Sequence, residues 1–97
     1  MIRNVVLAKL KDGHDVDEVA RIAQGLSALD LPGTLHYTIG TDAGLREGNW
    51  DFVIVADFTD VEAYRGYDAD AEHNALRARL APMVDQIARA QFEVPAG

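Results

Sequence analysis

The chain has 97 residues, of which 48% are hydrophobic and 26% are charged. This composition is ordinary for a globular protein, and the length predicts one domain over residues 1–97. Sixteen acidic residues against nine basic ones give a net charge of −7. This charge argues against nucleic acid or an anionic membrane as a partner. Without cysteine, the chain has no disulfide framework and no thiol chemistry.

The sequence shows no targeting or membrane-spanning segment. The longest apolar run near the N-terminus covers residues 5–8, which is too short for the core of a signal peptide. No stretch approaches the length of a transmembrane helix. We therefore expect a cytoplasmic protein with no membrane partner.

The first half of the chain reads as a strand, a helix and a second strand. Residues 3–11 are rich in β-branched side chains and predict a strand. Residues 15–29 place apolar side chains at helical spacing, with Asp15 as N-cap and Glu18 completing a capping-box pattern. Leu31, Pro32 and Gly33 end this helix, and residues 34–41 predict the second strand.

Residues 50–58 are the strongest strand signal in the chain, and they follow a polar loop over residues 42–49. One face of this strand carries apolar side chains at alternate positions: Phe52, Ile54, Ala56 and Phe58. Val53 and Val55 occupy the other face, so both faces look buried in the middle. Because one chain's helices cover only one face of a sheet, we expect a second subunit against the other, and hence a homodimer.

Residues 61–80 predict two helices separated by a break. Asp60 is a suitable N-cap for the first helix, and Asp70 for the second, because Asp favours caps and turns over helix interiors. Tyr67 then ends the first helix and His73 lies at the third position of the next. The break lets both rings point into one cavity, which a six-residue spacing on one straight helix does not allow.

The last part of the chain predicts a helix, a short strand and a tail. Pro82 interrupts or restarts the helix, residues 83–89 continue it, residues 90–94 form a strand, and residues 95–97 are a tail. The resulting order is βαββαβ, so the predicted fold is α+β with the ferredoxin-like arrangement.

Tyr64, Tyr67 and His73 form the only close grouping of residues suited to proton chemistry. Imidazole matches proton transfer near neutral pH, so His73 is a candidate general base, with a half-buried residue that fixes the helix start as the alternative. Tyr67 could donate a hydrogen bond to developing enolate charge, or it could be a core residue. Tyr64 reads as a packing residue beside them.

The pocket wall is predicted from strand faces. Val6, Ala8, Ile54 and Ala56 share a strand face with Asn4 or Phe52, and the two alanines leave room for a ligand. Asn4 could orient a ligand or simply begin the strand. The three histidines have no metal-ligand spacing, so we predict no metal site, and no cofactor motif is present.

Several short motifs together resemble one known family. They are the strand ending in Lys9-Leu10-Lys11, the junction of residues 58–62, the Tyr64/Tyr67 segment, His73, and Leu80-Ala81-Pro82. In this combination the chain resembles the stress-responsive A/B barrel (Dabb) family of dimeric α/β-barrel proteins. The resemblance implies a ferredoxin-like protomer, a homodimer with a barrel at its interface, and a small-molecule pocket between sheet and helices.

The resemblance also bears on activity. Most members of the family have no assigned activity, and a few are polyketide cyclases that close a poly-β-keto chain by aldol condensation without a cofactor. In those cyclases a Tyr and a His six residues later flank the pocket, and Tyr67 and His73 match that pair. This chain departs from the pattern with Asn4 in place of a strand-start His, Asp70-Ala71 in place of His-Pro, and Phe52 at a third-strand position that can hold a His.

Three functional hypotheses follow. The first is a cofactor-independent, cyclase-like or lyase-like enzyme acting on a small ketone-bearing or aromatic molecule, with His73 as base and Tyr67 as oxyanion partner. The second is a non-catalytic, stress-associated protein whose pocket holds an apolar ligand. The third is a structural dimer without a ligand.

Overall fold

The chain alternates strands and helices in the predicted βαββαβ order. The computed structural model describes residues 1–95, so Ala96 and Gly97 of the predicted tail lie outside the described residues. Its elements are β1 (Ile2–Leu10), α1 (Val16–Ser27), β2 (Thr34–Thr41), β3 (Phe52–Phe58), α2 (Val61–Ala69), α3 (Ala71–Leu80), a 3₁₀ turn (Ala81–Met83) and β4 (Val84–Glu93).

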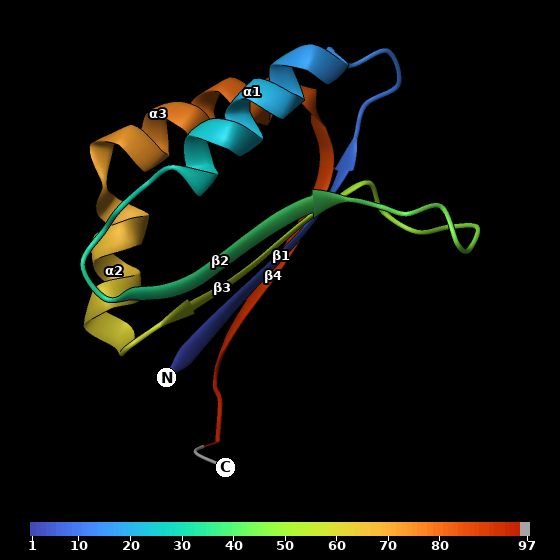
Figure 1. Cartoon of the computed structure of the whole chain (residues 1–97). Coiled ribbons are helices and arrows are strands. Elements are labelled where there is room, and N and C mark those ends of the chain that lie inside the picture. Colours follow the sequence, from blue (N-terminus) through green and yellow to red (C-terminus); the bar gives the residue numbers. More distant parts are fainter. Residues whose placement is uncertain (96–97) are drawn as a thin grey trace.

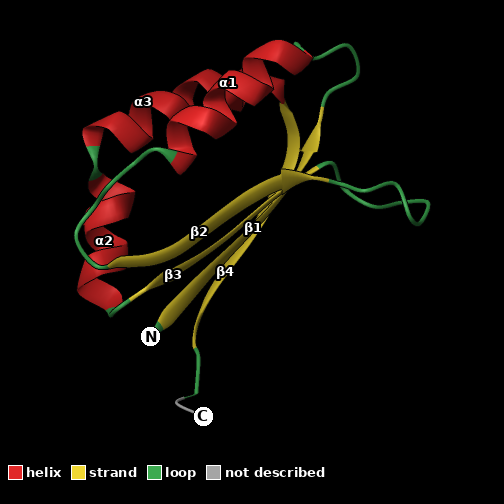
Figure 2. Ribbon diagram, in the orientation of Figure 1, coloured by secondary structure: helices red, strands yellow, loops and turns green. Residues whose placement is uncertain are grey.

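The four strands form one antiparallel sheet in the order β2-β3-β1-β4. The first and third strands of the chain therefore lie in the centre, as the ferredoxin-like arrangement requires. The helices lie on one side of the sheet, with α1 and α3 next to each other (Figures 1 and 2). No helix or strand of residues 1–95 covers the opposite face (Figure 1).

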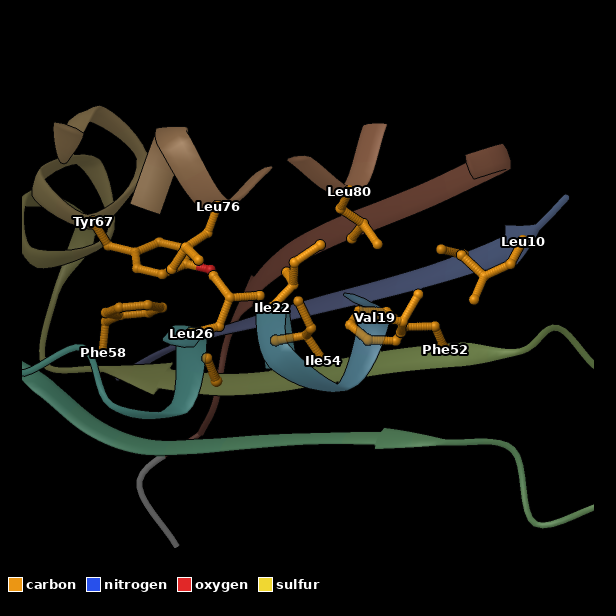
Figure 3. Close-up of a cluster of buried hydrophobic side chains, with 12 residues drawn as sticks. Leu10, Val19, Ile22, Leu26, Phe52, Ile54, Phe58, Tyr67, Leu76 and Leu80 are labelled. Carbon is orange, nitrogen blue, oxygen red and sulfur yellow. The ribbon is translucent and has the colours of Figure 1, made fainter. Parts of the chain in front are cut away.

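The hydrophobic core lies between the helices and the inner face of the sheet (Figure 3). Helix α1 buries Val19, Ile22 and Leu26, which recur at helical spacing and so form one apolar stripe. The sheet contributes side chains that include Phe52 and Phe58, both almost fully enclosed. Burial of side chains of this size stabilises the fold by about 1.5–3 kcal/mol each.

The predicted caps are present at all three helices. Asp15 accepts a hydrogen bond from the Glu18 amide at 3.1 Å, and Asp60 accepts one from the Ala63 amide at 2.8 Å. The Glu18 carboxylate accepts from Arg79 of α3 at 2.6 Å and from Arg21 at 3.3 Å. Glu18 therefore links α1 to α3, and only the Asp15 half of the predicted capping box is present among the described residues.

The prediction for the last segment was wrong. Met83 ends the 3₁₀ turn, but residues 84–89 are not helical, because β4 begins at Val84 and pairs with β1 from Leu10 to Ile2. The segment contains good helix formers such as Ala, Gln and Arg, so local propensity favoured a helix. Pairing along the whole of β1 overrides that propensity, because strand preference depends on the neighbours a strand finds.

The outer face of the sheet carries apolar side chains that no helix or strand of the described residues covers. Val5, Val53 and Val55 are half-buried there, and 43% of Leu7 is exposed. Register places Leu7 opposite Val53 on one side and Ala88 of β4 on the other. The inner face of β3 is buried as predicted, whereas Val53 and Val55 on its outer face are only half-buried by residues 1–95.

Candidate functional site

A cavity of about 60 Å³ lies between the inner face of the sheet and helices α2 and α3. Most of its wall is apolar, with a few polar groups at separate points. The residues that line it are Asn4, Val6, Ala8, Leu26, Phe52, Ile54, Tyr64, Tyr67, Asp68, His73, Arg77, Leu80, Ile87 and Arg89.

The helix break positions the two central residues of this cavity. Asp70 follows α2 in an extended conformation, and its carboxylate accepts a hydrogen bond from the His73 amide at 2.9 Å. The Asp70 amide donates to the Tyr67 carbonyl at 3.2 Å, which closes α2. As a result the Tyr67 and His73 rings stack with centroids 4.0 Å apart and planes tilted by 35°. The two rings are in direct contact at one wall of the cavity.

His73 is 95% buried and its Nδ1 atom has no hydrogen-bond partner in the described part of the chain. Burial lowers the pKa of the imidazole, and the charge of Arg77 lowers it further. Asp68, Asp70 and the Tyr67 carbonyl oppose this shift. The net direction keeps the ring neutral at neutral pH, so one of its nitrogens is available to accept a proton.

The Tyr67 hydroxyl shares a hydrogen bond of 2.9 Å with the hydroxyl of Tyr37 on β2. Burial raises the pKa of the Tyr67 phenol, and the neighbouring Tyr37 adds to the rise. Tyr67 therefore stays protonated, so its hydroxyl can donate a hydrogen bond but does not serve as a base. The Tyr67 ring also packs on Phe58, with centroids 5.1 Å apart (Figure 3).

The structure brings most of the sequence-predicted site residues together. Asn4, Val6, Ala8, Phe52, Ile54 and Tyr64 line the same cavity as Tyr67 and His73. Ala56 does not: it is fully buried on the same strand face, but in the core rather than at the cavity wall. Asn4 is also buried, and its side-chain oxygen accepts a hydrogen bond from Gln91 of β4 at 2.8 Å.

Sequence reasoning missed other residues of the site. Ile87 and Arg89 were placed on a predicted helix, whereas β4 places them beside the cavity. Tyr37 was passed over as a neighbour of His36. The alternation of β2 did carry a signal, because it places Tyr37 on the same face as Ile39, opposite Ala56 of β3. Leu26, Asp68, Arg77 and Leu80 were also unassigned.

Within residues 1–95, no three His, Asp or Glu side chains come close enough to hold a metal ion. In the same part of the chain, no helix is long and apolar enough to cross a bilayer.

Comparison with known proteins identifies the family. The family model of the stress responsive A/B barrel domain matches residues 2–94. The chain belongs to this family. A Dabb family protein with a ferredoxin-like fold from Mesorhizobium loti is 27% identical, with a TM-score of 0.73 and coverage of 99% of this chain and 97% of that chain. No protein of curated function matches the sequence significantly.

Two further solved structures show how widely this Dabb fold recurs. A dimeric ferredoxin-like protein of unknown function from Thermobifida fusca is 32% identical, with a TM-score of 0.85 and coverage of 96% of this chain and 90% of that chain. A hydroxynitrile lyase from Passiflora edulis is 15% identical, with a TM-score of 0.83 and coverage of 99% and 94%. At this low identity the second likeness shows the fold alone.

Proposed function

We propose that this Dabb protein binds a small ketone-bearing molecule and catalyses proton abstraction next to its carbonyl without a cofactor. One observation carries the proposal: a buried histidine with an unpaired nitrogen stacks on a buried tyrosine at the wall of an apolar cavity. An unsatisfied buried polar atom is uncommon in proteins and calls for an explanation. Some structural neighbours have an assigned activity and others do not, so the fold alone does not assign a reaction to this chain and the site has to do so.

In the proposed reaction, the neutral imidazole of His73 takes a proton from the carbon beside the ketone. The carbon–hydrogen electron pair moves into the carbonyl, and the developing enolate oxygen accepts a hydrogen bond from the Tyr67 hydroxyl. Attack of the enolate carbon on a second carbonyl of the same molecule forms the new bond of an aldol ring closure. The imidazolium then returns its proton to the resulting alkoxide, so the protein is unchanged at the end.

The apolar wall supports this chemistry. Hydrogen bonds to developing charge are stronger where water is excluded. In the polyketide cyclases that the chain resembles, a Tyr and a His at this spacing flank the pocket. The Passiflora hydroxynitrile lyase shows that a lyase occurs on the same fold. Cyclase-like and lyase-like reactions both require a base beside a carbonyl or hydroxyl group.

The proposal is tested by deuterium exchange at the methyl group of acetophenone in D₂O, followed by NMR. This reaction isolates proton abstraction beside a carbonyl and needs no knowledge of the natural substrate. We expect the protein to accelerate exchange, and His73→Ala to reduce the acceleration by about 10²- to 10⁴-fold, the usual contribution of a general base. Tyr67→Phe keeps the ring and removes the hydroxyl, so its loss of rate isolates the hydrogen bond to the enolate.

His14→Gln is the matched control, because His14 lies in the turn before α1 and outside the cavity. Amide NMR spectra of each variant establish that the fold is retained. Exchange rates in His73→Ala and Tyr67→Phe equal to that of the unmodified protein would show that the pair is structural and that the catalytic proposal is wrong.

A second function, ligand binding without catalysis, is favoured by one specific observation. The Tyr67 hydroxyl is already hydrogen-bonded to Tyr37, so it has to share or exchange that bond to reach an enolate. Under this alternative, acetophenone shifts the NMR signals of His73 and Tyr67 but its exchange is not accelerated.

We also propose that the chain forms a homodimer through the outer face of its sheet. The uncovered apolar side chains of β1 and β3 support this arrangement, and the protein from Thermobifida fusca is itself described as dimeric. Two sheets facing each other would close the barrel that gives the family its name.

A further inference from the structure

A second hollow lies next to the inner cavity, in the groove between α3 and β4. Its volume is about 460 Å³, against about 60 Å³ for the inner cavity. The two share four wall residues: Arg77 and Leu80 of α3, and Ile87 and Arg89 of β4. The inner cavity has room for about four to six water molecules, which is below the usual size of a ligand site, whereas the groove is within the usual range. A ligand whose reacting end reaches His73 therefore extends past these four residues.

The shared wall carries two guanidinium groups in a strongly acidic chain. The Arg77 guanidinium already has partners within the protein, because it donates hydrogen bonds to Asp68 at 3.2 Å and to Asn74 at 2.7 Å. Arg89 has no ion pair and no side-chain hydrogen bond to any of residues 1–95. Register places Arg89 opposite Val6, on the same sheet face as the cavity. One positive charge at the junction of the two hollows is thus without a counter-charge.

Neither of the two carboxylates that line these hollows, Asp68 and Asp85, is paired with Arg89. Asp68 is paired with Arg77. Asp85 also lines the groove, four residues from Arg89 along β4, which corresponds to a backbone separation of roughly 13 Å at the usual strand rise. It forms no ion pair with Arg89 in the part of the chain that the structure describes.

The influences on the pKa of Tyr64 agree with the position of Arg89 beside the cavity. Burial raises the pKa of the Tyr64 phenol and Asp68 adds to the rise, whereas Arg89 and Arg77 oppose it. Both guanidinium groups therefore act on the side of the cavity that Tyr64 lines.

We infer that the ligand of this site carries a carboxylate, which Arg89 binds at the junction of the inner cavity and the α3–β4 groove. The inference rests on the proposed function, since it assigns the other end of the same ligand. One uncompensated guanidinium matches a single negative charge, and its planar fork matches the two oxygens of a carboxylate. The ketone lies inward at Tyr67 and His73, and the carboxylate lies outward at Arg89.

Three small probes separate the two ends of the ligand. Acetophenone has the ketone alone, 4-acetylbenzoate adds a carboxylate, and 4-acetylbenzamide has the same size as the benzoate without its charge. We expect NMR titration to show 4-acetylbenzoate binding at least about tenfold more tightly than 4-acetylbenzamide, a preference that weakens as salt is added. Arg89→Gln should remove the preference, and Arg89→Lys should retain part of it.

Arg46→Gln is the matched control, because it makes the same change in net charge on an exposed loop outside both hollows. It should leave the preference intact. Equal affinities for the benzoate and the benzamide in the unmodified protein, no binding of either, or a preference that survives Arg89→Gln, would each overturn the inference.

The same titrations separate this inference from the proposed function. If acetophenone shifts the His73 ring signals and the carboxylate preference is absent, the ketone site stands and the carboxylate site is wrong. If the preference depends on Arg89 while no probe shifts His73, the carboxylate site stands and the proposed function is wrong.

Discussion

At the scale of single residues, the site is defined by two aromatic rings with opposite requirements. In the proposed reaction His73 needs a neutral ring in order to accept a proton, and its surroundings lower the pKa of the imidazole. In the same reaction Tyr67 needs a bound proton in order to donate, and burial raises the pKa of its phenol. Desolvation disfavours the charged form of both groups, so one physical cause produces both protonation states.

We predict that the titration midpoint of His73, followed by the NMR signals of its imidazole, lies below its ordinary value of 6.5. Between that lowered pKa and 6.5, the unfolded chain binds more protons than the folded one. The free energy of unfolding therefore decreases as the pH falls through this window. Glu18 and Asp57, whose pKa values are lowered by Arg79 and Arg3, act only at more acidic pH. A midpoint at or above 6.5 would contradict the prediction.

The hydroxyl pair of Tyr37 and Tyr67 is testable by a double-mutant cycle. Either Tyr37→Phe or Tyr67→Phe leaves one hydroxyl without its partner, which costs about 1 kcal/mol or more in a partly buried site. The double variant removes both hydroxyls, so its loss in free energy of unfolding should be smaller than the sum of the two single losses by about 1 kcal/mol. Urea denaturation measures all four proteins, and strictly additive losses would show that the 2.9 Å contact does not couple the two residues.

At the scale of elements, the site depends on how the α2–α3 pair is held against the sheet. The loop from α1 to β2 makes this contact through Gly33, whose carbonyl accepts a hydrogen bond from the Thr59 amide at 2.9 Å. Gly33 has a φ of +81°, and a Cβ atom placed there would lie 2.5 Å from the Cβ of Ala63. The loop and the first turn of α2 approach this closely only because residue 33 has no side chain.

We predict that Gly33→Ala lowers the free energy of unfolding by about 2 kcal/mol or more, because backbone strain and overpacking both contribute. Gly13→Ala is the control, since Gly13 has a similar φ of +77° but open space around it. The control should lose only the backbone contribution of about 1–2 kcal/mol. Urea denaturation measures the free energy of unfolding of both variants. Equal losses at the two glycines would mean that the structure around Ala63 makes room for the added methyl group at no cost in stability.

At the scale of the whole molecule, the two faces of the sheet have different roles. The inner face builds the core and the cavity. The outer face presents Val5, Leu7, Val53 and Val55, and no helix or strand within residues 1–95 lies above them. Arg3 and Asp57 lie on the same outer face and form a two-pronged ion pair at 2.7 and 3.0 Å, which holds the pKa of Asp57 below its usual value. An apolar face with a satisfied ion pair is suited to association with a second copy.

We predict that sedimentation equilibrium at micromolar concentration gives twice the protomer mass of 10.6 kDa. Leu7→Asp places a charge on the proposed interface and should shift the protein towards the monomer, because an unpaired buried charge is strongly unfavourable. Leu45→Asp makes the same chemical change in a loop where 86% of the residue is exposed, so it should leave the dimer intact. A monomer in the unmodified protein would contradict the proposed dimer.

Local signals in the sequence determined most of the fold. The apolar stripe of α1, the alternation of β3 and the caps at Asp15, Asp60 and Asp70 all appear in the structure as predicted. These features depend on residues within one helical turn or along one strand, so they can be predicted from the sequence. The close approach of Tyr67 and His73 belongs with them, because it follows from the helix break at Asp70.

Only the tertiary structure decided the features that join distant segments. Residues 84–89 became part of a strand because β1 offered a free edge, although their local propensity favoured a helix. That change brought Arg89 beside the cavity, and the pairing of β2 with β3 brought Tyr37 within 2.9 Å of Tyr67. Contacts of this kind depend on the free energy of packing distant segments together, which no local pattern of residues encodes.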